Sequence, residues 1–205
     1  MAKKRKTRIQ KEVVENQEKV NYSQENSKKE IFSYDYSYDS EVEVLYIHRA
    51  FIPVDVKGDL DAHTMVTLKI KNVSRAVLTI EFVRHDDLLS PTIKSTRYTL
   101  KELKEEKPFS ITQEDFKRAK KYIVFTGNFE IDKNSVLMLE QLRQNIINGI
   151  PNDEAKYNLP ECYKTEGVFT MPLRNLKNIV KLRTDKSAIK EFQDLAYKIK
   201  EKLDI

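Results

Sequence analysis

The feature that most limits the possible folds is an alternating segment that runs straight into a helical pattern. Between Thr64 and Ile70 apolar and more polar residues alternate, which is the period of a half-buried strand. The apolar residues that follow fall at helical spacing, and Asn72 is expected to cap this helix. The residues of the helical stripe are Val73, Ala76, Val77, Ile80 and Val83. A strand and a helix that each have one apolar face must bury these faces against each other or against further elements.

Similar patterns predict the other elements of the chain. Strands are expected at residues 42–47 and 164–171, where β-branched and aromatic residues concentrate. Helices are expected at about 112–125, 132–148, 174–182 and 186–203, with a short helical turn at 153–158. Ser110 or Thr112 would cap the first of these helices, and Asp132 would cap the second. The sequence therefore predicts the α+β class, with a small mixed sheet packed with several long helices.

Charge is concentrated at the start of the chain. Residues 1–30 contain nine Lys or Arg and five Glu, so they carry +4 of the net charge of +5. Because this segment has few large apolar residues, we predict a disordered basic tail followed by one domain at 31–205. The run from Lys3 to Lys6 could make weak contacts with nucleic acid, or it could be a solvated tail. Residues 32–39 alternate aromatic with small polar side chains, which suits an edge strand or a docking segment.

Composition also excludes several classes of protein. No apolar run approaches the roughly 20 residues that a membrane-spanning helix needs, and no apolar signal segment follows the basic start, so we expect a cytoplasmic protein. Cys162 is the only cysteine, so no internal disulfide can form, and we expect a small buried apolar residue rather than a nucleophile. His48, His63 and His85 do not make a zinc set with one cysteine, and no metal site is expected.

A polar stretch from Arg84 to Tyr98 directly follows the apolar run at 77–83. It contains two arginines, a lysine, a histidine and several hydroxyl groups. Arginine grips phosphate or carboxylate through two N–H groups, so the stretch suits an anion site at the edge of a core element. Two other readings stay open. The stretch could be an ordinary polar loop, and cations at the end of the predicted helix would also be favoured by the helix dipole.

Three blocks of sequence resemble the flavin-dependent thymidylate synthase family. The first joins Arg84-His85 to Lys94-Ser95-Thr96-Arg97-Tyr98 and is similar to the family's Arg-His-Arg, spacer, Ser-x-Arg-Tyr signature. The second, at 153–160, resembles its Ala-Arg/Lys-x-x-Leu-Pro segment, and the third, at 173–183, resembles its Asn-x-Arg-Ser-Leu-x-Asn-Phe-Leu-x-Leu-Arg helix. The blocks cover about Thr64 to Leu203. Their shared order and spacing are much harder to obtain by chance than a single motif.

The resemblance implies a function and a set of partners. In this family dUMP is reductively methylated to dTMP, methylenetetrahydrofolate donates the carbon, and NADPH reduces a bound FAD. The family builds its sites between the subunits of a homotetramer and needs no cysteine nucleophile, which fits the setting of Cys162. Such chemistry requires a phosphate clamp, cationic groups beside the uracil carbonyl, and a platform for the flavin ring.

The resemblance also assigns roles to individual residues. The residues that would hold the nucleotide are Glu81, Ser95, Arg97, Lys156 and Arg183. The residues that would face the flavin are Arg84, His85, Arg174 and Asn178. Among these, Arg183 would be the catalytic residue, because it would lie against the pyrimidine and stabilise its ionised form. Without the resemblance, Arg174 and Arg183 could equally be part of a solvated basic helix face.

Some positions depart from the family pattern, and most of them fall on the flavin side. Asp86 replaces the second arginine of Arg-His-Arg, which puts an anion near a flavin pyrophosphate. Pro172 stands where the family has an asparagine, Ala62 stands where it has a glutamate, and Pro91 lies in a longer spacer. These departures motivate an alternative: a catalytically silent homologue that keeps a nucleotide or anion pocket and serves as a binding or assembly protein.

Overall fold

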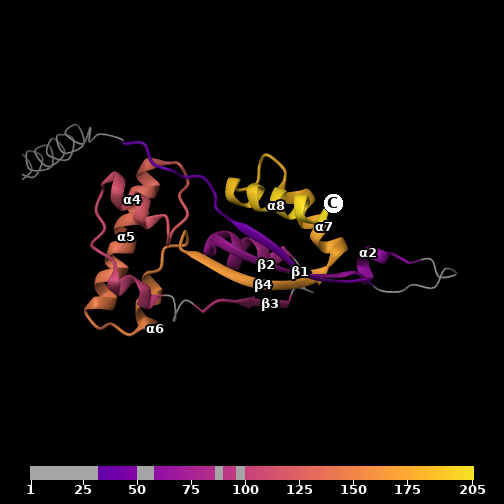
Figure 1. The fold of residues 1–205 in the computed structure, drawn as a ribbon, viewed down its shortest axis with the longest axis horizontal. Helices are drawn as coiled ribbons and strands as arrows, with labels where there is room; N and C mark the ends of the chain where they lie inside the picture. Colours follow the sequence, from indigo (N-terminus) through magenta and orange to yellow (C-terminus); the bar gives the residue numbers. More distant parts are fainter. Residues whose placement is uncertain (1–31, 50–57, 86–89, 96–99) are drawn as a thin grey trace, which may run out of the picture. The chain divides into compact units, whose positions relative to one another are not determined.

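The computed structural model describes residues 32–49, 58–85, 90–95 and 100–205, and Tyr34–Ile205 forms one compact unit. Its described strands are β1 (Glu41–His48), β2 (Met65–Ser74), β3 (Ser90–Ile93) and β4 (Lys164–Pro172). They form one sheet in the order β1-β2-β4-β3, in which every neighbouring pair runs antiparallel (Figure 1). Together with the helices, this sheet confirms the predicted α+β class.

The helices of the described residues differ in length and in kind. The α-helices are α2 (Leu60–His63), α4 (Gln113–Ala119), α5 (Phe129–Ile147), α6 (Asn152–Ala155), α7 (Leu173–Arg183) and α8 (Lys190–Leu203). Three short 3-10 helices are η2 (Val83–His85), η3 (Leu100–Glu105) and η4 (Lys156–Asn158). The segment η1 (Ala76–Phe82) is a π-helix, a rare form that is often found at functional sites. In the described part of the chain, no helix is long and apolar enough to cross a bilayer.

The main core lies between one face of the sheet and the helices η1, α7 and α8. Alternate residues of β2 and β4 point into it and are fully buried, including Leu68, Ile70 and Phe169. Phe82 of η1 packs its ring against Phe169, with 5.0 Å between ring centroids. This burial stabilises the fold, and it fixes the ends of η1 and α7 over the sheet.

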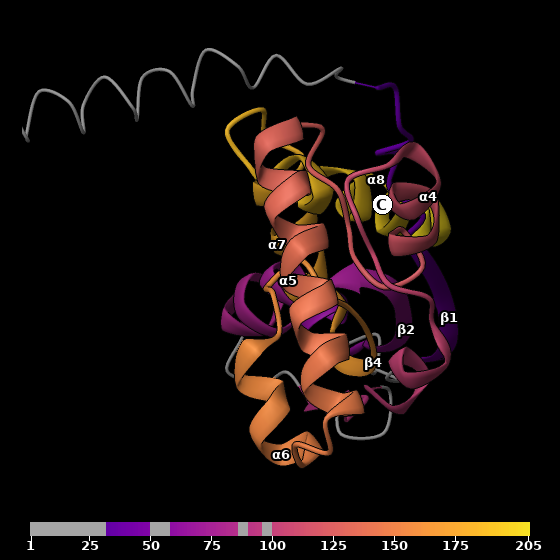
Figure 2. The same ribbon diagram turned by 90° about the vertical axis from the view of Figure 1, so that its left-hand side faces the viewer.

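A second group of aromatic side chains lies among α4, α5 and the segment that precedes β1. Tyr34 packs edge-on against Phe116 and Phe125, and Phe116 stacks on Phe129. Residues 34–40 are extended but belong to no described strand, so of the two predicted roles this segment has the docking role. In Figure 2 the molecule is turned so that α5 and α6 lie at the front.

The helix predicted to begin at Val73 begins later, because β2 continues to Ser74. Asn72 does not cap it. It has a φ of 58° and its side chain donates to the Asp39 carbonyl and to Glu41 Oε1. Asparagine is common both in the left-handed backbone region and at helix caps. The sequence predicted a cap, but Asn72 adopts the left-handed conformation within β2.

Asp132 was also wrongly predicted as a cap. The side chain of Asn128 accepts from the N–H groups of Glu130 and Ile131, so α5 starts one turn before Asp132, which is fully buried. Thr112 does cap α4, but this helix ends at Ala119 rather than near residue 125. The last helix starts at Lys190 rather than near 186.

The polar stretch after η2 contains a strand that the sequence did not predict. Residues 90–93 form β3, which pairs with β4 from Ser90 opposite Thr170 to Ile93 opposite Gly167. Pro91 is tolerated because β3 lies at the edge of the described sheet, where one side of the strand needs no ladder hydrogen bond. The predictions for residues 1–30, Asp86 and Arg97 lie outside the described residues.

Candidate functional site

Four of the predicted site residues meet where η1, η2 and α7 end. We call Glu81, Arg84, His85 and Arg183 the Arg183 cluster. Arg183 Nε donates to His85 Nε2 at 2.7 Å, its Nη2 donates to Glu81 Oε2 at 3.1 Å, and Nη2 also approaches His85 Nε2. Arg84 Nη1 donates to the other oxygen of Glu81 at 3.1 Å. The sequence separation of about a hundred residues is closed by packing of α7 and η1 on the same core.

The electrostatics of the Arg183 cluster favour a neutral imidazole. Burial lowers the pKa of His85, and the adjacent Arg183 cation lowers it further. A neutral ring can accept a hydrogen bond at Nε2, which agrees with donation from Arg183 Nε. The guanidinium also lies over the ring of Phe192, with 4.9 Å from Cζ to the ring centroid. The guanidinium is therefore held from three sides.

The exposure of the Arg183 cluster decides what it could bind. The side chains of Arg183 and Glu81 are each 19% exposed, whereas that of Arg84 is 63% exposed. Within the described residues, the contacts of Arg183 use Nε and Nη2, and a guanidinium has further N–H donors on Nη1. The cluster can therefore present one oriented, half-buried cation to an anionic or electron-rich group.

The predicted flavin-facing residues are divided between the two ends of α7. Arg174 and Asn178 are both exposed, and at 1.5 Å per residue they lie about 13 Å and about 7 Å along the helix from Arg183. Arg174 Nη1 forms an ion pair with Asp59 Oδ2 at 3.3 Å, beside α2. Exposed pairs of this kind stabilise little, so the guanidinium can exchange one anionic partner for another.

Two predicted nucleotide ligands lie away from the Arg183 cluster. Ser95 is exposed just after β3, and Lys156 is exposed on η4. No hydrogen bond or ion pair between described residues joins either of them to the cluster. One chain therefore brings Glu81, Arg84, His85 and Arg183 together and leaves Ser95 and Lys156 apart.

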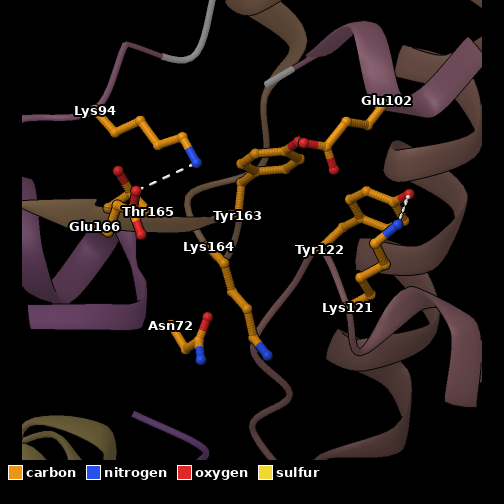
Figure 3. Close-up of a pocket in the computed structure, with 9 residues that line it drawn as sticks. All are labelled: Asn72, Lys94, Glu102, Lys121, Tyr122, Tyr163, Lys164, Thr165 and Glu166. Atoms are coloured by element: carbon orange, nitrogen blue, oxygen red, sulfur yellow. Dashed lines mark hydrogen bonds and ion pairs between the residues drawn. The ribbon is translucent and has the colours of Figure 1, made fainter. Parts of the chain in front are cut away.

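The structure also contains a polar cavity of about 210 Å³ that sequence reasoning missed (Figure 3). Its lining residues are Asn72, Lys94, Glu102, Lys121, Tyr122, Tyr163, Lys164, Thr165 and Glu166. Lys94 pairs with Glu166 at 3.2 Å, and the mostly buried Lys164 pairs with Asp39 at 2.6 Å. Of these residues only Lys94 belongs to a block that the sequence analysis singled out, and the others come from separate segments that share no motif, so the cavity was not expected.

Cys162 lies beside another cavity, of about 290 Å³ and mostly apolar. Burial raises the pKa of its thiol to about 11, so the sulfur stays protonated at neutral pH. A protonated thiol is a poor nucleophile. The sequence predicted a buried Cys162, whereas the residue is only partly buried in the structure.

The fold and the Arg183 cluster define an α+β protein that presents a half-buried guanidinium, oriented by a neutral histidine, above an antiparallel sheet. Residues 7–204 match the family described as thymidylate synthase complementing protein (Thy1), and the chain belongs to this family. The match begins at residue 7, well before the three blocks that carry the resemblance. Family membership therefore covers nearly the whole chain.

Relatives and solved structures give the same family. The flavin-dependent thymidylate synthase of Campylobacter jejuni (strain RM1221) is 47% identical over 134 residues, which are 65% of this chain and 63% of that protein. That of Wolinella succinogenes is 45% identical over 141 residues, 69% of this chain and 67% of the relative. A crystal structure of thymidylate synthase X from Helicobacter pylori with FAD and dUMP has a TM-score of 0.64 and 39% identity, covering 68% of this chain and 67% of that one.

Proposed function

We propose that this protein converts dUMP to dTMP by reductive methylation, with methylenetetrahydrofolate as carbon donor, NADPH as reductant and FAD as cofactor. The observation that carries the proposal is the Arg183 cluster, in which Arg84, His85 and Arg183 from two of the family's sequence blocks meet beside Glu81 of η1. Membership in the family supports it, and the comparisons do not favour a silent homologue. The reaction would take place in the cytoplasm.

Arg183 would be the residue that acts on the base. A fixed guanidinium beside a uracil carbonyl stabilises negative charge on the ring, because the donors need not reorient as that charge develops. Glu81 and neutral His85 hold the guanidinium in place by accepting from Nη2 and Nε. A protonated histidine could not accept, so the lowered pKa of His85 keeps this arrangement intact at neutral pH.

The residues that would hold FAD fit such a group in their chemistry. Arg84 and Arg174 are exposed cations, and Asn178 adds an exposed amide, so the set offers donors to a pyrophosphate and to ring oxygens. Arg174 and Asn178 lie along α7 and Arg84 lies on η2, and this spread suits an extended dinucleotide better than a compact anion. His85 would be the fourth member of this set. When bound, FAD supplies the hydride transfer that the protein side chains cannot perform.

The nucleotide clamp is proposed to form between subunits of a homotetramer. Ser95, Arg97 and Lys156 would hold the phosphate of dUMP through a hydroxyl and two cations. Ser95 and Lys156 make no contact with the Arg183 cluster among the described residues, so a complete site is easier to build from two chains than from one. A solution mass near four times the chain mass of 24.1 kDa would support this assembly.

The test is dTMP formation by the purified protein, together with its visible spectrum. We expect a bound flavin spectrum and NADPH oxidation that depends on dUMP. Arg183→Lys should keep the flavin and lower kcat at least about a hundredfold, because a lysine cannot reproduce the planar fork held by Glu81 and His85. Lys181→Ala, an exposed change on the same helix, is the control and should keep full activity. A colourless protein that leaves dUMP unchanged would contradict the proposal.

A further inference from the structure

The start of η1 is held by a set of acceptors from outside the helix. The first N–H groups of a helix have no partner within it and need one elsewhere. Arg75 N–H donates to the Tyr163 carbonyl and Ala76 N–H to the Glu161 carbonyl, both at 3.0 Å. Ser74 N–H donates to Glu191 Oε1 at 2.7 Å, and Val77 N–H donates to Ser74 Oγ at 3.2 Å. Each of these four N–H groups therefore has a specific acceptor.

Glu191 controls two of these four contacts. Its Oε1 accepts from Ser74 N–H, and its Oε2 accepts from the Ser74 hydroxyl at 2.6 Å. A hydroxyl has one proton and two lone pairs, so giving the proton to Glu191 turns a lone pair toward Val77 N–H. The carboxylate thus fixes the rotation of the Ser74 hydroxyl as well as its backbone.

Ser74 and Glu191 are both buried, so their hydrogen-bond geometry is tightly constrained. Glu191 is 8% exposed and Ser74 is 2% exposed. Burial raises the pKa of Glu191, while the two hydrogen bonds from Ser74 act in the opposite direction. A carboxyl group in such a place is expensive to keep unless its hydrogen bonds are made. Both oxygens of Glu191 accept from Ser74, so the burial of this carboxyl group depends on the geometry of Ser74.

Phe192, the next residue of α8, contacts the residues at the end of η1. The ring of Phe192 lies 6.0 Å from the rings of both Phe82 and His85, measured between centroids. It also carries the guanidinium of Arg183 on its face. Adjacent residues of α8 therefore hold the start of η1 and the Arg183 cluster at its end.

We propose that Glu191, acting through Ser74, is a positioning residue that sets the start of η1 and thereby the placement of Glu81 and His85 against Arg183. The effect on catalysis rests on the function proposed above, whereas the effect on the Arg183 cluster does not. η1 is a single π-helical segment of seven residues. A displacement of its first turn should therefore displace Glu81, its sixth residue, by a similar amount.

The first experiment measures catalysis in folded variants. Ser74→Ala and Glu191→Gln should lower kcat/KM for dUMP about ten- to a hundredfold, since small misplacements of site residues have effects of this size. Ser74→Thr, which keeps the hydroxyl, should restore most of the activity. If Glu191 acts through Ser74, the double variant should lose less than the product of the two single losses. Glu201→Gln, an exposed change on α8, is the matched control and should match the wild type.

The second experiment reads the Arg183 cluster without any substrate. The chain has three histidines, so the His85 ring can be followed by NMR titration and assigned with His85→Gln. In the wild type its pKa should lie below the ordinary value, and in Ser74→Ala it should rise, because a loosened His85 becomes less buried and loses contact with Arg183. Ser74→Ala changes no charge, so the rise would report movement alone.

The two readouts separate the possible failures. Variants that melt earlier but keep the wild-type pKa of His85 and the wild-type kcat/KM would show a purely structural pair and overturn the proposal. A wild-type protein without activity would remove the proposed function, and the titration of His85 would still decide whether Glu191 positions the cluster. An unchanged His85 in Ser74→Ala would then overturn it.

Discussion

At the scale of single residues, Asp132 shows how one buried carboxylate can organise several loops. It is fully buried and accepts from Tyr34 Oη at 2.7 Å, from the N–H and hydroxyl of Thr126 at 2.8 Å, and from Gly127 N–H at 2.9 Å. It thereby joins the segment before β1 to the turn that precedes α5. Losing it would remove the acceptor shared by these four donors and leave an empty polar site inside the protein.

Asp132→Ala should therefore lower the free energy of unfolding by about 3 kcal/mol or more, the usual cost of stripping a buried charged acceptor from its partners. Urea unfolding followed by circular dichroism would measure it. Glu130→Ala, an exposed change in the same helix, should stay within about 0.5 kcal/mol of the wild type. Equal effects of the two changes would mean that Asp132 is not the organising acceptor.

At the scale of elements, the central strand β4 depends on a close approach at Gly167. Gly167 pairs with Ile70 of β2 on one side and with Ile93 of β3 on the other. A Cβ at this position would lie 2.9 Å from the ring of Phe169 and 3.1 Å from the Thr92 carbonyl oxygen. Phe169 is fully buried, so its ring has no room to move aside.

Gly167→Ala should destabilise the protein by about 1–3 kcal/mol, because overpacking forces a shift of the buried ring or of β3. A fall in the melting temperature would show it. Gly149→Ala makes a useful comparison, since a Cβ there meets no atom within 4 Å and only the positive φ of 82° opposes it. If Phe169→Leu does not relieve the loss caused by Gly167→Ala, the ring is not the source of the strain.

The elements also show what the sequence could and could not predict. Strand β2 was predicted from alternation, and strands β1 and β4 from their β-branched and aromatic residues, because these are local signals that burial enforces. Asn72 and Asp132 were misassigned, since a residue that can cap a helix can also sit in a left-handed turn or bind loop amides. β3 was missed because its four residues carry no alternation and include a proline. Its existence depends on β4, more than 70 residues away in the sequence.

The Arg183 cluster could not be found from periodicity either. Nothing local places Arg183 beside His85 and Glu81, and the expectation came from the resemblance of sequence blocks. The polar cavity shares only Lys94 with these blocks and was not expected. A site assembled from distant segments can be predicted only when the packing is known or when a family resemblance indicates which residues lie together.

At the scale of the whole molecule, the net positive charge is concentrated at the start of the chain. Residues 1–30 carry +4 of the net +5, so the rest of the chain is nearly neutral. We expect weak binding to duplex DNA that falls steeply between about 50 and 200 mM salt and is lost when residues 1–30 are deleted. Fluorescence anisotropy of a labelled duplex would measure it. A deletion variant that binds as well as the full chain would place the contact elsewhere.

The extended segment at 34–40 has a consequence for how the chain is made. Its partners lie far along the sequence: Tyr34 bonds to Asp132, Asp39 pairs with Lys164, and Ser40 Oγ donates to Asp194 of α8, 154 residues later. Closing such long loops is slow, so we expect the segment to dock after the surfaces that receive it have formed. During synthesis the segment emerges early and cannot finish docking until α8 has left the ribosome. Residues 34–40 are thus synthesised first in this unit, and we expect them to complete their contacts last.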